Sequence, residues 1–110
     1  MNKQEYLDFH RQFCVQMCKL TEKKNADYTG VSDNAFNNVC AGEKLGVGTT
    51  EQGLLFRMLD KVSRVISFIR TEGLEVKEES IVDTLLDLAN YSVMLAGYLS
   101  YKQQRNEESK

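Results

Sequence analysis

The segment 79–90, which reads ESIVDTLLDLAN, constrains the fold more than any other part of the chain. On an α-helix its acids Glu79, Asp83 and Asp87 and its last residue Asn90 fall within roughly 80° of one another. The opposite side of this helix is apolar. Acids spaced four residues apart repel one another, and the segment contains no lysine or arginine to balance them. We therefore expect a helix that is buried on one side and faces a cation on the other.

The apolar periodicity of the remaining chain indicates an all-α fold. Proline is absent from the 110 residues, and β-branched runs are few, so strands are not favoured. Thr49 and Gln52 form the pattern of a capping box, which marks a helix start after a glycine-rich loop. The pattern predicts a bundle of about four helices, over residues 2–24, 34–41, 50–71 and 76–102.

The length predicts a single domain, residues 1–102, followed by a tail, 103–110, that has no apolar residue and is expected to be disordered. The net charge of −2 argues against a surface that coats duplex nucleic acid. Three cysteines, no signal peptide and no long apolar span predict a cytoplasmic protein without a membrane partner. The large apolar surface of these helices predicts a homo-oligomer.

A second set of charged residues lies on the helix predicted over 50–71. Arg57, Asp60, Lys61 and Arg64 fall within about 100° of arc on that helix. Such a set is typical of a solvated face with internal ion pairs, for example Asp60 with Arg64. It equally suits a site in which Asp60 completes a carboxylate cluster while the basic residues hold phosphates. The acidic face of the last helix makes the two interpretations comparable.

The end of the first predicted helix carries Lys24, Asp27 and Tyr28. An aromatic ring and a carboxylate are suited to stacking on a base and to binding a sugar hydroxyl or a metal. Amides in the next segment, Asn38 among them, read base edges or hold loops equally well. This region is therefore a candidate for nucleotide contacts, and packing or helix termination explains it equally well.

These residues resemble the motifs of the all-α nucleoside triphosphate pyrophosphohydrolases, the group that includes MazG and the dimeric dUTPases. That family carries ExxE on one helix and ExxD on a later helix, followed by an apolar run and an asparagine. Asp83 and the run after it are similar to the second motif, with Glu79 one place further back than the motif glutamate. Asp60 corresponds to the second acid of the first motif, whereas Arg57 stands where its first glutamate belongs.

From residue 24 onward the chain also resembles a small, largely phage and bacterial family called nucleotide modification associated domain 1. The matching pieces occur in the family's order and include the sequences KNADY, DNAFNN, RMLDK and ESIVD, the last continuing through NY. The resemblance implies a MazG-like helical fold and a nucleotide ligand.

The pyrophosphohydrolase resemblance further implies Mg²⁺ as cofactor and conversion of a nucleoside triphosphate to a monophosphate and pyrophosphate. Catalysis would fall to three acids, Glu79, Asp83 and Asp60. The same three acids together with Asp87 would bind Mg²⁺. Nucleotide contacts would come from a larger set: Lys24, Asp27, Tyr28, Asn38, Arg57, Lys61, Arg64, Asn90 and Tyr91.

The arginine at position 57 leaves two further hypotheses open. A positive charge in place of a metal-binding glutamate favours direct phosphate contact, so the chain could bind or sequester a nucleotide or nucleotide messenger without turnover, as a phage-type sponge does. The remaining hypothesis is a helical interaction module whose acidic face binds a basic partner protein.

Overall fold

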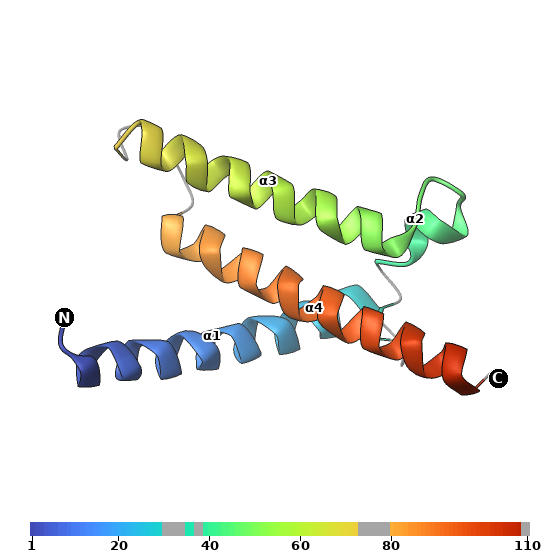
Figure 1. Ribbon diagram of the computed structural model, residues 1–110, viewed down its shortest axis with the longest axis horizontal. Helices are drawn as coiled ribbons and strands as arrows, with labels where there is room; N and C mark the ends of the chain where they lie inside the picture. Colours follow the sequence, from blue (N-terminus) through green and yellow to red (C-terminus); the bar gives the residue numbers. More distant parts are fainter. Residues whose placement is uncertain (30–34, 37–38, 73–79, 109–110) are drawn as a thin grey trace.

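The computed structural model describes residues 1–29, 35–36, 39–72 and 80–108 (Figure 1). These residues form four helices and no strand, which confirms the all-α prediction. The helices are α1 (Lys3–Thr29), α2 (Ala41–Lys44), α3 (Thr50–Arg70) and α4 (Ile81–Glu108). No helix of the described residues is both long and apolar enough to cross a membrane.

Helix α4 makes the two most extensive helix–helix contacts among the described residues. It packs along α3, which runs antiparallel to it, and on its other side it is crossed by α1 (Figure 1). α2 lies beside the start of α3, and the two termini lie at opposite ends of the molecule (Figure 1). The crossing of α1, α4 and α3 is therefore the place where distant parts of the sequence meet.

Helix boundaries differ from the predicted ones where local signals compete. α1 continues past the two lysines that suggested its end and spans Lys3–Thr29, because basic residues stabilise a helix end without terminating the helix. The short helix spans Ala41–Lys44. Residues 35–36 and 39–40 are turns, and the other positions before Ala41 in the predicted helix 34–41 lie outside the described residues. The tail expected to be disordered is helical as far as Glu108, since glutamine, arginine and glutamate are good helix formers.

Side chains cap the starts of α3 and α4. Thr49 Oγ1 accepts a hydrogen bond from Gln52 N, and Thr49 N donates to Gln52 Oε1, so the predicted capping box is present. At α4, Ser80 Oγ accepts from the backbone N of Asp83 at 3.1 Å. Both caps satisfy amide groups that the first helical turn leaves without partners.

The core of the described residues is small. Its buried apolar side chains are Leu54, Leu86 and Tyr98, joined by the buried threonines Thr50 and Thr84. Phe36 adds an aromatic contact, with its ring 5.4 Å from that of Tyr98 in an edge-on arrangement. This core lies between α3 and α4.

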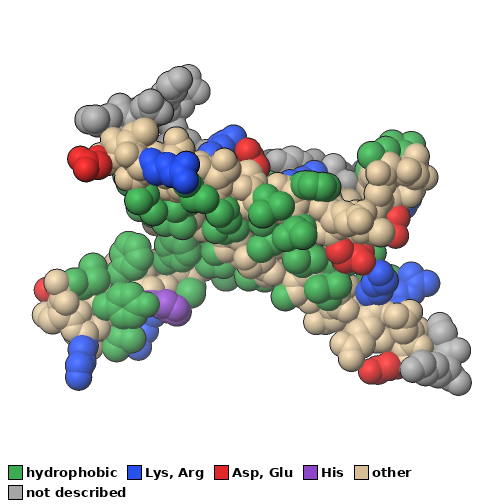
Figure 2. Space-filling view, turned by 45° about the horizontal axis from the view of Figure 1, so that its top comes forward, with side chains coloured by type: hydrophobic (Ala, Val, Ile, Leu, Met, Phe, Trp, Pro, Cys, Tyr) green, Lys and Arg blue, Asp and Glu red, His purple; other side chains and the backbone are tan. Residues whose placement is uncertain are grey.

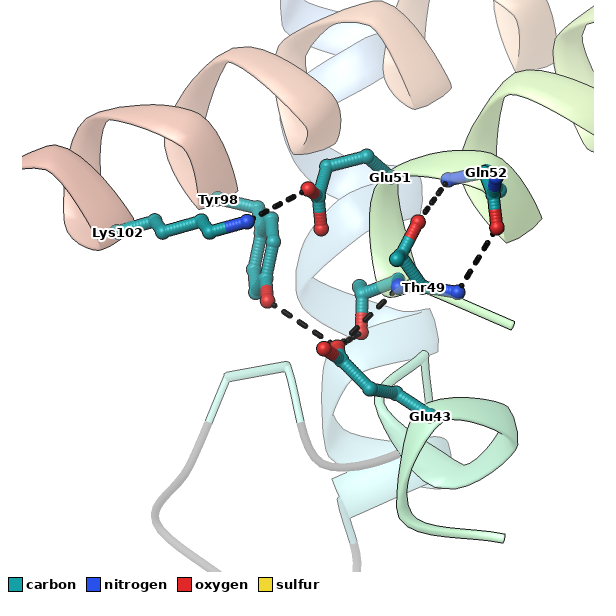
Figure 3. A network of polar contacts seen from close by, with 7 residues as sticks. Glu43, Thr49, Glu51, Gln52, Tyr98 and Lys102 are labelled. Carbon is teal, nitrogen blue, oxygen red and sulfur yellow. Dashed lines mark hydrogen bonds and ion pairs between the residues drawn. The ribbon is translucent and has the colours of Figure 1, made fainter. Parts of the chain in front are cut away.

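A polar network fixes α2 to the core (Figure 3). Glu43 Oε2 accepts hydrogen bonds from Thr50 Oγ1 at 2.6 Å, from Thr50 N at 3.2 Å and from Tyr98 Oη at 3.4 Å. Beside it, Lys102 Nζ contacts Glu51 Oε2 at 2.8 Å. The hydrogen bonds from Thr50 lower the pKa of Glu43, and the Lys102 hydrogen bond lowers that of Glu51. Both carboxylates are therefore charged at neutral pH. Glu43 holds α2 against α3 and α4, and Glu51 joins α3 to α4.

Candidate functional site

Asp87 connects all three long helices. Its two carboxylate oxygens contact Lys24 Nζ of α1 at 3.3 Å and Lys61 Nζ of α3 at 3.1 Å. Asp87 and Lys61 are largely buried, with 15% and 13% of their side chains exposed, whereas Lys24 is 37% exposed. The crossing is thus held by one carboxylate between two ammonium groups.

The charges around Asp87 shift the pKa of its carboxyl group. Partial burial alone would raise the pKa of this carboxyl, but the Lys61 hydrogen bond and the charges of Lys24 and Lys61 outweigh it and lower the pKa below the ordinary value. Asp87 is therefore ionised at neutral pH. Each lysine has three N–H donors and uses one of them for this carboxylate, so Asp87 orients both ammonium groups.

Asn90 lies one turn after Asp87 on the same face of α4. Its Oδ1 accepts a hydrogen bond from Thr21 Oγ1 of α1 at 3.0 Å. Its Nδ2 is buried and finds no acceptor among the described residues. A buried donor without a partner costs about 1–3 kcal/mol, so this amide is a candidate for contact with a ligand.

Arg57 and Tyr91 form a second contact between α3 and α4. The guanidinium carbon of Arg57 lies 5.9 Å from the centre of the Tyr91 ring, within the range of a cation–π interaction. These two side chains line an open hollow of about 370 Å³ together with Phe56, Asp60 and Lys61. The hollow brings two aromatic rings, two cations and one carboxylate to one place on the surface.

A neighbouring hollow of about 400 Å³ lies between α3 and the glycine-rich loop. It shares Phe56 and Arg57 with the first, and its walls are mainly apolar or backbone, including Val47, Gly48 and Leu54. Gly46 in this loop has a φ of +77°, a conformation that glycine adopts without strain. The two hollows meet at Phe56 and Arg57.

The acids predicted to bind metal do not gather in the described part of the chain. Asp60 pairs with Arg64 at 3.4 Å, and both are more than half exposed, as the solvated-face interpretation predicts. Asp83 is exposed, one turn before Asp87 on α4. No group of three or more histidine, cysteine, aspartate or glutamate side chains suited to a metal occurs among the described residues, and Glu79 lies outside them.

The remaining predicted contacts fall where the structure gives no side chain. Asp27 and Tyr28 lie in the last turn of α1, and their side chains are not described. Asn38 lies outside the described residues. The crossing therefore brings together six predicted residues: Lys24, Arg57, Lys61, Asp87, Asn90 and Tyr91.

Comparisons with protein-family models, curated proteins and solved structures were made for the whole chain. None of them matches it. What can be said of the site therefore comes from its own geometry and charge, and the resemblance to MazG-like proteins stays a prediction.

Two residues at the site were not singled out in the sequence. Thr21 precedes Lys24 by three residues, so helical spacing places both on one face of α1. This spacing from Lys24 could have identified Thr21 as a residue of the site. Phe56 is 70% exposed and lies at the junction of the two hollows. Its position beside Arg57 gave no indication that it faces outward, because neighbouring residues on a helix point about 100° apart.

Proposed function

We propose that this protein binds a nucleotide, with the phosphates at the crossing of α1, α3 and α4. The observation that carries the proposal is the hollow where two basic side chains lie beside two aromatic rings. Arg57 and Lys61 line it together with Tyr91, Phe56 and one carboxylate, that of Asp60. Basic side chains beside aromatic rings suit a ligand that carries both phosphates and a base.

The neighbouring groups suit the rest of a nucleotide. Tyr91 and the exposed ring of Phe56 offer aromatic surface on which a base can stack, and such stacking contributes about 1–3 kcal/mol per base. The unpaired Nδ2 of Asn90 can donate to a sugar or phosphate oxygen. Hollows of this size fall in the range of small-molecule sites.

Binding without turnover is the version of this function that the side chains favour. Asp87 is held by two lysines and Asp60 by Arg64, so neither carboxylate is arranged to bind Mg²⁺ in this structure. The described residues do not fit a magnesium cluster, and we derive no metal-dependent step from them. A protein that sequesters or senses a nucleotide or nucleotide messenger matches this arrangement.

Metal-dependent pyrophosphohydrolysis is the second candidate, and Asp83 is the observation that favours it. Its carboxylate is exposed, and among the described residues no hydrogen bond or ion pair holds it. It lies on the same face as Asp87, one helical turn away. An exposed acid one turn from Asp87 supports this second candidate.

Replacing Arg57 by alanine is expected to weaken nucleotide binding by about 10- to 100-fold, because one charge-assisted hydrogen bond contributes about 1.5–3 kcal/mol. Isothermal titration calorimetry with ribo- and deoxynucleoside mono-, di- and triphosphates measures the affinity. Arg70→Ala is the matched control, since Arg70 is an exposed arginine at the far end of the same helix; its affinity should equal that of the unchanged protein.

The same samples, supplemented with Mg²⁺ and assayed for pyrophosphate, separate the two candidates. Binding without product supports sequestration, whereas product formation that Asp83→Asn abolishes supports hydrolysis. No binding to any nucleotide of the panel, or equal losses in Arg57→Ala and Arg70→Ala, would contradict the proposed site.

A further inference from the structure

A row of exposed apolar side chains follows α3 outside the core. Its members recur at alternating spacings of four and three residues, and they are between 37% and 67% exposed: Leu55, Leu59, Val62, Ile66 and Ile69. We call this row the α3 seam. It lies about 120° around the helix from the buried residues Thr50 and Leu54, so α3 has a second apolar face beside the one that packs on α4.

The spacing of the α3 seam is that of helices that pair with other helices. Positions that alternate by three and four residues insert as knobs between the side chains of a facing helix. Nothing in the described part of the chain covers these side chains, since all five are exposed. The seam therefore has the pattern of a helix–helix contact without its partner.

The outer part of α1 is uncovered as well. Tyr6, Leu7 and Phe9 are about half exposed, and residues 1–12 are exposed throughout. Figure 2 shows hydrophobic side chains along the body of the molecule and on the α1 arm, which stands apart from the body across a notch. Ring contacts between Phe9 and Phe13 join the exposed part of this arm to its half-buried part.

The surface area indicates how much of the molecule is uncovered. The accessible surface is 8519 Å², whereas a compact monomer of this mass exposes about 6,200 Å². The radius of gyration is 16.6 Å, compared with about 13 Å for a compact domain of this length. The excess is roughly 2,300 Å² per chain, and twice that amount falls within the roughly 2,000–5,000 Å² of obligate homodimer interfaces.

We propose that a second copy of this chain covers the α3 seam, in a two-fold symmetric dimer in which the two seams pack against each other. Such a contact uses the same surface on both subunits and so must not bring like charges together. The positions that flank the central part of the seam are uncharged: Phe56, Met58, Ser63 and Val65. The seam is therefore compatible with a copy of itself, and the exposed face of the α1 arm adds apolar area to the same assembly.

Size-exclusion chromatography with light scattering at micromolar concentration tests this proposal. The unchanged protein should have twice the 12.6 kDa mass of the chain. Ile66→Glu, which places a charge in the seam, should have the mass of one chain and retain a helical circular dichroism spectrum. Ser67→Glu adds the same charge to the same helix at an exposed position about 120° around the helix from the seam, and it should leave the dimer intact.

If Ile66→Glu does not fold, Ile66→Ala replaces it and should raise the dissociation constant of the dimer about tenfold or more. A single-chain mass for the unchanged protein would overturn the proposal and leave the seam for a different partner. A dimer that resists both Ile66 variants, or that Ser67→Glu disrupts as readily as Ile66→Glu does, would also overturn it.

Discussion

Leu54→Ala is expected to lower the free energy of unfolding by about 2–4 kcal/mol, the usual cost of truncating a buried leucine. Leu54 is 1% exposed, and it is one of three buried apolar side chains in the described residues. Because the core is small, its neighbours have few alternative contacts with which to fill the space. In a domain of this size the loss corresponds to a decrease in Tm of about 10–20 °C.

Thermal unfolding followed by circular dichroism measures this effect, with all samples at one protein concentration because assembly also contributes to Tm. Leu45→Ala is the control, since Leu45 is 80% exposed and its truncation should change stability by less than about 0.5 kcal/mol. Equal effects of the two substitutions would show that the core is not built around Leu54.

Asp87→Ala is expected to destabilise the protein by about 1–3 kcal/mol, because it leaves two partly buried ammonium groups without their shared counter-ion. Chemical denaturation at neutral pH measures the loss. Asp60→Ala removes an acid from an exposed i, i+4 ion pair, and its effect should be below about 0.5 kcal/mol.

The effect of Asp87→Ala should depend on pH in a defined direction. The pKa of Asp87 is lower in the folded protein than its ordinary value, so its contribution is fully present above the ordinary aspartate pKa and is lost as the pH falls through the lowered one. The difference between Asp87→Ala and the unchanged protein should therefore shrink in acid. A difference that is constant down to strongly acidic pH would contradict the ion-pair account.

The helices could be predicted because their evidence is local. Apolar residues at three- and four-residue spacing marked α3 and α4, and Thr49 with Gln52 marked the start of α3 through a capping box that the structure confirms. The end of α1 was placed too early, because the basic residues that suggested it stabilise a helix end without terminating the helix.

Several residues of the site could be predicted from the sequence, but the contacts between them could not. Asp87, Lys24 and Lys61 were all candidates, yet Asp87 was assigned to a metal, whereas the structure places it between the two lysines. That contact joins residues 63 positions apart in the sequence, and helical periodicity carries no information about which helix crosses which. The repulsion expected between the acids of α4 indicated a nearby cation. For Asp87, the ammonium groups of Lys24 and Lys61 supply the positive charge.

The most direct test of the proposed function is a nucleotide titration followed by amide chemical shifts of the isotope-labelled protein. The account predicts that the largest shifts occur at the crossing, at Arg57, Lys61, Asn90 and Tyr91, and that they saturate with nucleotide concentration. Saturable shifts confined to the loop between α2 and α3 or to the α3 seam, or no saturable shifts with any nucleotide, would contradict it.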